Sequence, residues 1–323
     1  MADVTISKPK IAILDDYYHR AQHYADWNSC NVADFVFFDK AMSAESELVE
    51  KLSGFNAIGI MRERTPFPAS LISQLPELEL LITSGKKNAS VDIKAAKAAG
   101  VTVCGTDSPG HATAELALLL IMSLSRKLIP LVNELKNNGA WQPEMGRDLR
   151  GRNLGILGLG RLGSQLAGFA QALGMNVLAW SENLQEEQCT DQNVTYVSRE
   201  ALFRQSDFVS IHLRHSDRTH HMVNLTDLKN LGADSFIVNT SRAEIIDPDA
   251  LKTALDDELI SGAATDVYEI EPASNSSWMV NHPRILATPH IGYCTVETFE
   301  VFYQQMLEGF VAYYNGNPIR VIS

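Results

Sequence analysis

Short apolar runs recur along the whole chain, and segments with helical spacing or helix-forming composition separate them. In the first third of the chain these runs predict strands over residues 11–14, 35–38, 57–61, 78–83 and 101–103. Segments 43–52 and 91–99, which lie between such runs, are expected to be helices. Strands that are apolar throughout and alternate with helices are typical of parallel sheets, because helices then cover both faces.

A second series of apolar runs in the rest of the chain repeats the same alternation. It predicts strands over residues 154–157, 177–180, 208–212, 236–239, 262–265 and 285–287. The chain of 323 residues is also longer than one average domain. We therefore expect an α/β protein made of two halves, each a doubly wound parallel sheet.

Two long segments with helical patterns complete the predicted organisation. Residues 111–137 are predicted to form one helix between the two halves, and Asn137-Asn138-Gly139 to end it. Residues 295–314 follow the last strand, and we expect this helix to pack back on the first half. The predicted domains are residues 1–106 together with 295–323, and residues 107–294.

The most specific motif is a glycine-spaced turn directly after the strand at 154–157. Its residues, in the spacing Gly-x-Gly-x-x-Gly, are Gly158, Gly160, Arg161, Leu162 and Gly163. The first glycine permits a tight turn, the second lets backbone approach a phosphate, and the third lets helix and strand pack closely. A helix over 161–173, then Gly174 and a strand at 177–180, complete a βαβ unit. The sequence therefore predicts a dinucleotide pyrophosphate site at this helix N-terminus.

Composition and charge narrow the class of protein further. Hydrophobic residues make up 45% of the chain and charged residues 20%, and no apolar stretch is long enough to span a bilayer. The first ten residues lack the apolar core of a signal peptide, and four scattered cysteines fit a reducing compartment. The net charge of -12 disfavours nucleic-acid and acidic-membrane partners. We expect a cytoplasmic protein that binds a small molecule.

Three segments that follow predicted strands carry side chains suited to catalysis. Arg242 follows the strand at 236–239 and could bind a carboxylate with both arms of its guanidinium, although a lone arginine after a strand could equally form a surface salt bridge. Glu271 lies in the acidic segment 266–272 and precedes a proline. His290, in a stiff loop after the last strand, has a side chain suited to giving and taking a proton near neutral pH. Because carboxyl ends of parallel strands share one edge, we expect these groups to converge.

The order of Arg242, Glu271 and His290 downstream of the glycine turn is similar to that of the D-isomer-specific 2-hydroxyacid dehydrogenases. The segments that carry the resemblance are residues 149–155, 207–212, 247–262, 266–269 and 288–292. The resemblance covers nearly the whole chain. It implies a Rossmann-type cofactor domain, a flavodoxin-like substrate domain, and reversible reduction of a small 2-oxoacid to its D-2-hydroxyacid.

The resemblance also implies a role for each candidate residue. Arg242 would bind the 2-oxoacid carboxylate and polarise its carbonyl, and His290 would donate the proton in reduction. Glu271 would pair with His290 and orient its ring. Asp266 would hold the carboxamide end of the nicotinamide. Backbone groups of the substrate-binding residues would cradle the carboxylate; these residues are Ser84, Gly85, Lys86 and Lys87.

The predicted cofactor is NAD, with NADP as the alternative. Beyond the glycine turn, the residues expected to contact it are Thr113, Ser181, Glu182, His212, Leu213, Thr219, Thr240, Ser241 and Asp266. Ser181 occupies a position that is usually acidic, and Glu182 follows it, so that a negative side chain opposes a 2′-phosphate. Arg214 or His215 from a neighbouring loop could instead accommodate that phosphate.

Several alternatives remain open at this point. Lys86 and Lys87 either receive a second anionic group of the substrate or point to solvent, and Arg62 and Arg64 raise the same question. A histidine cluster over 212–221 has no partner cysteine pair, so no metal site is expected. The chain could also be a dinucleotide-sensing regulatory protein with little turnover. The resemblance further implies a homodimer.

Overall fold

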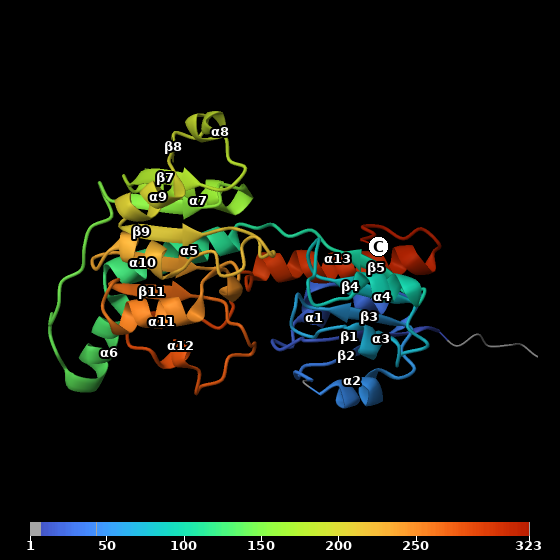
Figure 1. The fold of residues 1–323 in the computed structure, drawn as a ribbon. Coiled ribbons are helices and arrows are strands. Elements are labelled where there is room, and N and C mark those ends of the chain that lie inside the picture. Colours follow the sequence, from blue (N-terminus) through green and yellow to red (C-terminus); the bar gives the residue numbers. More distant parts are fainter. Residues whose placement is uncertain (1–7, 43, 323) are drawn as a thin grey trace, which may run out of the picture. The chain divides into compact units, whose positions relative to one another are not determined.

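The computed structural model describes residues 8–42 and 44–322, which form two compact units (Figure 1). One unit comprises residues 1–109 and 295–323, and the other residues 110–294. The division falls three residues beyond the boundary at 106/107 that the sequence suggests. Residues 1–7 of the N-terminal segment, in which the sequence shows no signal-peptide core, lie outside the described residues. Residue 43, the first residue of the predicted helix 43–52, also lies outside them.

The first unit is built on a five-stranded parallel sheet with the order β2-β1-β3-β4-β5. Its strands are β1 (Lys10–Ile13), β2 (Asp34–Phe37), β3 (Ala57–Ile60), β4 (Leu80–Thr83) and β5 (Thr102–Gly105). Its helices are α1 (Ala21–Tyr24), η1 (Trp27–Ser29), α2 (Glu45–Leu52), α3 (Ala69–Ile72), α4 (Ile93–Ala98) and α13 (Val296–Tyr314). This strand order is that of flavodoxin-like domains.

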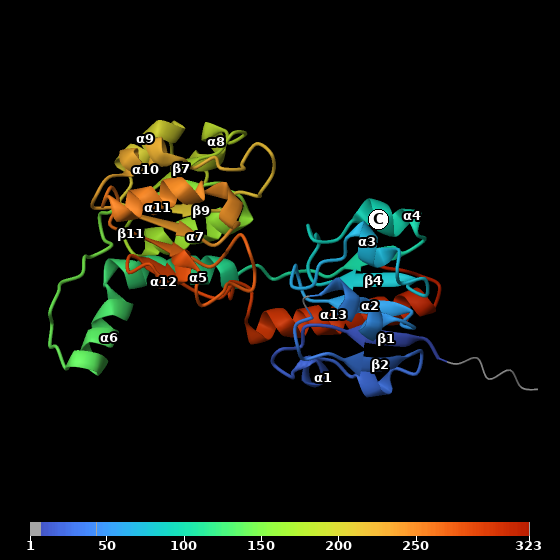
Figure 2. The same ribbon diagram turned by 60° about the horizontal axis from the view of Figure 1, so that its bottom comes forward.

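Helix α13 belongs to the first unit although it follows the last strand of the second. It lies beside β4 in the ribbon (Figures 1 and 2), and glycines allow the close approach. A Cβ built on Gly309 would lie 2.7 Å from Ile82, and one built on Gly59 would lie 3.4 Å from Phe310. The opposite face of the sheet packs on α2, α3 and α4 through a separate apolar cluster. Helices therefore cover both faces, as the apolar strands predict.

The second unit contains a seven-stranded parallel sheet with the order β12-β11-β10-β9-β6-β7-β8. Its strands are β6 (Asn153–Leu157), β7 (Asn176–Trp180), β8 (Thr195–Tyr196), β9 (Phe208–Ile211), β10 (Phe236–Asn239), β11 (Gly262–Thr265) and β12 (Ile285–Ala287). Its helices are α5 (Ala112–Ser125), α6 (Leu128–Asn138), α7 (Arg161–Ala172), α8 (Glu186–Thr190), α9 (Arg199–Gln205), α10 (Leu225–Leu231), η2 (Ala243–Ile245), α11 (Pro248–Asp256) and α12 (Trp278–Asn281). The order reverses between β6 and β9, which is where Rossmann-type sheets bind ligands.

Two apolar clusters fill the two faces of this sheet. Helices α5 and α7 contribute to one cluster, and α9, α10 and α11 contribute to the other. Each predicted strand of both series is present, within two residues of its expected ends. The expected fold class, two doubly wound parallel α/β domains, is therefore confirmed.

The single helix predicted over 111–137 is wrong, because the segment forms two helices. Helix α5 ends at Ser125, α6 begins at Leu128, and Lys127 between them has a left-handed φ of 49°. Pro130 explains the break, since a proline inside a continuous helix would clash with the carbonyl four residues earlier. Proline lacks a backbone N–H. In the first turn of a new helix this loss costs nothing, because an N–H at that position has no partner within the helix.

Candidate active site and dinucleotide site

The glycine turn after β6 has the geometry that a pyrophosphate site requires. Gly158 has a φ of 108°, and its N–H donates to Trp180 O at 2.9 Å, which fixes the turn beside the end of β7. A Cβ on Gly163 would lie 2.3 Å from the Gly158 carbonyl oxygen, so only glycine allows this helix-to-turn contact. A Cβ on Gly160 would meet open space.

The first turn of α7 offers backbone donors to a ligand. Gly160 is its N-cap and carries no side chain that could cap the helix. Within the described part of the chain, no side chain caps this end of the helix. The first N–H groups of such a helix, together with its dipole, favour an anion. The residues therefore fit the pyrophosphate of a dinucleotide.

The segment after β9 lies against this turn, on the other side of the point where the strand order reverses. A Cβ on Gly158 would lie 3.0 Å from the backbone of His212 and 3.0 Å from Leu213 Cδ2. Burial lowers the pKa of His212 to about 4, so its ring is neutral and shares a 2.9 Å hydrogen bond with Ser210 Oγ. The Ser241 hydroxyl donates to Leu213 O and joins this segment to the end of β10.

Four other residues that were predicted to contact the cofactor lie in different environments. Ser181 is half-buried and Glu182 exposed directly after β7, where an acidic side chain would oppose a 2′-phosphate. The Thr219 hydroxyl donates to Arg214 O and accepts from Ser216 N, each at 2.8 Å, so it closes its own loop. Arg161 lies with its guanidinium against Gly110, where a Cβ would be 2.4 Å away.

Thr240 provides an independent indication of a ligand at the end of β10. The residue is 7% exposed, and its Oγ1 is buried without a hydrogen-bond partner among the described residues. A buried hydroxyl is normally satisfied, because leaving it unpaired costs about 1–3 kcal/mol. A polar group of a bound cofactor would satisfy it.

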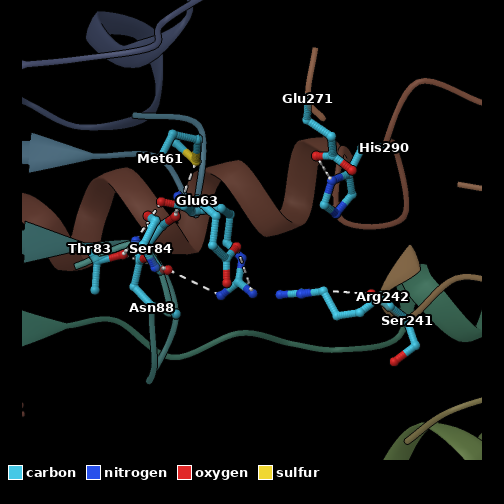
Figure 3. Close-up of polar contacts among 12 residues, drawn as sticks. Met61, Glu63, Thr83, Ser84, Asn88, Ser241, Arg242, Glu271 and His290 are labelled. Atoms are coloured by element: carbon cyan, nitrogen blue, oxygen red, sulfur yellow. Dashed lines mark hydrogen bonds and ion pairs between the residues drawn. The ribbon is translucent and has the colours of Figure 1, made fainter. Parts of the chain in front are cut away.

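His290 and Glu271 form a close pair in the second unit. Nδ1 of His290 lies 2.5 Å from Glu271 Oε2 (Figure 3). Burial raises the pKa of Glu271, but the hydrogen bonds from His290 and from Tyr268 N–H, together with the charge of Arg242, outweigh it and lower the pKa overall. Glu271 is therefore an anion at neutral pH, which leaves Nε2 of His290 as the ring nitrogen directed away from the pair.

Arg242 is held at the end of β10 by the side chain of Asn239. The Asn239 amide donates to Arg242 O at 2.8 Å, and its oxygen accepts from Ser241 N at 3.0 Å. The guanidinium donates to Ser241 O at 2.7 Å, as Figure 3 shows. The charge of Arg242 also favours the ionised form of Glu271, which helps to lower the pKa of that carboxyl.

Asp266 organises the segment that carries His290. Its carboxylate is 1% exposed and accepts from Thr288 Oγ1 at 2.6 Å and from the N–H groups of Ile291 and Gly292 at 2.8 Å each. Burial raises its pKa, and these bonds oppose the rise. Thr113 adds a 2.8 Å bond from its hydroxyl to Gly292 O. Sequence reasoning assigned both residues to the cofactor and missed these contacts, because three of the four partners of Asp266 and Thr113 are backbone groups.

The predicted substrate loop lies in the first unit. Ser84 is buried and its hydroxyl accepts from Arg62 N at 2.8 Å, while Gly85 has a φ of 85° and donates to Thr106 Oγ1 at 2.7 Å. Lys86 forms a 2.8 Å ion pair with Asp107, and its side chain is 77% exposed. Lys86 therefore points to solvent, which is the simpler of the two alternatives.

The basic residues before this loop are also engaged. Arg62 NH1 donates to Ser84 O at 3.3 Å and NH2 lies 3.5 Å from Glu63 (Figure 3 labels Ser84 and Glu63). Arg64 donates to Asp15 O at 2.9 Å and lies 4.4 Å over the Tyr17 ring. Sequence reasoning did not find Ser84 and Asp15 as partners, because they are 22 and 49 positions away along the chain.

The histidine cluster does not form a metal site in the described residues. His215 Nε2 lies 3.3 Å from His220 Nδ1, and the rings of His220 and His221 stack at 4.0 Å. His212 instead contacts Ser210.

Comparison with known proteins identifies the class. A model of the D-isomer specific 2-hydroxyacid dehydrogenase NAD binding domain matches residues 118–292. A glyoxylate reductase of Korarchaeum cryptofilum is 30% identical over 286 residues, covering 86% of this chain and 85% of that protein. A glycerate dehydrogenase of Methylorubrum extorquens is 30% identical over 287 residues, covering 85% of this chain and 88% of that protein.

A solved structure of a further protein is similar to this chain over most of its length. A phosphoglycerate oxidoreductase of Vibrio cholerae has a TM-score of 0.90 and 34% identity, covering 95% of this chain and 99% of that one. The chain therefore belongs to the D-isomer-specific 2-hydroxyacid dehydrogenase family. It is an NAD-dependent enzyme that acts on the CH–OH group of 2-hydroxyacids, and its second unit includes the NAD-binding domain. In the part of the chain that the structure describes, no helix is long and apolar enough to cross a membrane.

The glycine geometry makes a testable prediction. Gly163→Ala should lower the melting temperature and weaken NADH binding, because its Cβ would lie 2.3 Å from a backbone oxygen. Gly168→Ala, in the same helix, meets open space and should stabilise the protein by roughly 0.5–1 kcal/mol. Calorimetry and NADH fluorescence titration measure both effects. Equal stability and equal NADH affinity of the two variants would contradict the assignment.

Proposed function

We propose that this enzyme reduces a small 2-oxoacid to its D-2-hydroxyacid with NADH, using His290 as proton donor and Arg242 as carboxylate anchor. The observation that carries the proposal is the 2.5 Å contact between His290 Nδ1 and Glu271, within the influence of the Arg242 charge. A histidine oriented by a carboxylate and placed near a guanidinium suits acid–base catalysis on an anionic substrate.

Arg242, His290 and Glu271 each have a separate task in the reduction of the 2-oxoacid. NADH, when bound, would supply the hydride for C2 of the 2-oxoacid. The guanidinium of Arg242 binds the substrate carboxylate and polarises the C2 carbonyl. As the C–O double bond opens, its electron pair takes a proton from Nε2 of His290 and the hydroxyl forms. Glu271 stays ionised and stabilises the positive charge that the imidazole carries before it donates.

The two units take different parts in this proposal. The second unit is the dinucleotide-binding domain and carries Arg242, Glu271 and His290. The first is assigned as the substrate domain, with residues 84–87 as the proposed substrate-binding residues. Because Lys86 is paired with Asp107 in solvent, we favour substrates with one carboxylate, such as glyoxylate or hydroxypyruvate, over substrates with a second anionic group.

The proposal also covers the location of the enzyme in the cell. We place the enzyme in the cytoplasm, with four free cysteines as the supporting observation.

We also propose a homodimer formed through α6 and the segment after it. Helix α6 buries none of its residues, and it exposes Leu128, Ile129 and Leu135. Trp141 and Met145, which follow it, are 78% and 90% exposed. Such an apolar surface is typical of an interface.

Loss of the proposed groups should abolish turnover. His290→Asn and Arg242→Lys should each lower kcat/KM for glyoxylate or hydroxypyruvate reduction by about 100-fold or more, because one removes the proton donor and the other the two-armed anchor. NADH oxidation measured by absorbance tests this, with NADH affinity measured alongside.

A matched control is available in the same unit. His282 also pairs with a carboxylate, since its Nε2 lies 3.2 Å from Asp256. His282→Asn should therefore leave kcat/KM near that of the native enzyme. A kcat/KM of His290→Asn close to that of the native enzyme would refute the proposed mechanism. Tight NADH binding by the native protein without turnover of any 2-oxoacid would instead favour a dinucleotide sensor.

The proposed dimer can be tested by light scattering. The native protein should show twice the 35.6 kDa mass of the chain, and Leu128→Glu combined with Leu135→Glu should return it to the chain mass. Tyr196→Glu, which alters an exposed apolar side chain on β8, should leave the dimer intact. A native protein of 35.6 kDa would exclude the dimer.

A further inference from the structure

Tyr268 lies between Asp266 and Glu271 on the segment after β11 and makes hydrogen bonds with two of its atoms. Its backbone N–H donates to Glu271 Oε1 at 2.9 Å. Its phenol donates to Thr288 O at 2.8 Å, on the segment that carries His290. One residue therefore contacts both the carboxylate of the pair and the backbone beside the imidazole.

The acceptor of the phenol is also the group that holds the backbone of His290. Thr288 O accepts from His290 N at 3.0 Å, a bond between residues two apart that spans Pro289. Such three-residue turns suit a central proline, whose φ is fixed. His290 then has a left-handed φ of 50°, which is uncommon for a side chain of this type. The turn that aims the imidazole thus depends on the Thr288 carbonyl.

These bonds close a ring that includes the proton donor. The ring runs from Tyr268 N–H to the Glu271 carboxylate, from that carboxylate to His290, from His290 N to Thr288 O, and back to the Tyr268 phenol. We infer that Tyr268 is a positioning residue of the reduction, whose phenol fixes the Thr288 turn so that Glu271 and His290 keep their mutual orientation. The inference rests on the proposed role of His290.

The chemistry of the phenol suits this task. Burial, together with the charges of Asp266 and Glu271, raises the pKa of Tyr268 to about 12, so the hydroxyl remains a donor at any ordinary assay pH. The ring itself packs against the apolar cluster shared by α9, α10 and α11. Phenylalanine would keep this packing and lose the hydrogen bond alone, which separates the positioning role from a role in the core.

Asp266 does not duplicate this function. Its bonds go to the Thr288 side chain and to the N–H groups that follow His290. The phenol of Tyr268 instead bonds to the carbonyl before His290. The two residues therefore restrain the histidine segment through different groups.

Tyr268→Phe tests the inference. We expect kcat for 2-oxoacid reduction to fall about five- to tenfold, the range set by one lost hydrogen bond, while the Kd for NADH stays unchanged. In the Glu271→Gln background the same change should alter kcat by less than about twofold, because the relay that the phenol positions is already broken. Tyr313→Phe removes a comparable phenol bond, to Glu79 O at 3.4 Å in the first unit, and should leave kcat unchanged.

Two results would overturn the inference. One is a native kcat in Tyr268→Phe; the other is an equal fold-loss with and without the Glu271 carboxylate, which would indicate a purely structural role. Neither result would touch the proposed function, which is tested separately by the kcat/KM of His290→Asn and by turnover of 2-oxoacids by the native protein.

Discussion

The buried carboxylate of Asp266 is the constraint on which the catalytic segment depends. It lies at the end of β11 and binds the segment that follows β12 through a hydroxyl and two N–H groups. Gly292 must be a glycine for this contact, since a Cβ there would lie 2.9 Å from Asp266 Oδ2. Adjacent parallel strands bring the two segments together, and the carboxylate converts that proximity into a fixed position for His290.

Glu271 and His212 lie at the carboxyl-terminal edge of the sheet in the second unit, and their environments suit them to different tasks. Glu271 has a lowered pKa because His290, Tyr268 N–H and Arg242 favour its anion over the opposing effect of burial. Burial lowers the pKa of His212, whose ring stays neutral beside the glycine turn. The edge of one sheet thus holds a neutral imidazole near the dinucleotide site and an ionised carboxylate, which contacts His290, at the proposed reaction site.

Much of this arrangement could be predicted from the sequence, because it follows from periodicity and from strand ends. The apolar runs predicted the strands, and the positions of Arg242, Glu271 and His290 after three of them indicated one sheet edge. The glycine spacing of Gly158, Gly160 and Gly163 predicted a turn whose close contacts the structure shows.

The rest depends on contacts that no local pattern encodes. The break at Lys127 was signalled by Pro130, yet the apolar pattern on both sides favoured one helix. Two bonds of Asp266 and the phenol bond of Tyr268 go to backbone groups of residues 288–292, which every residue type possesses. The pairing of Lys86 with Asp107 likewise depends on distance in space, since it joins residues 21 positions apart.

The pH dependence of hydride transfer tests the central claim most directly. Single-turnover NADH oxidation by a 2-oxoacid, followed by stopped-flow absorbance, reports reduction with the native enzyme and with Glu271→Gln. Because the Glu271 carboxylate stabilises the protonated imidazole, the pH at which the rate falls to half its maximum should be lower in the variant. An unchanged or higher half-maximal pH in Glu271→Gln would contradict the account.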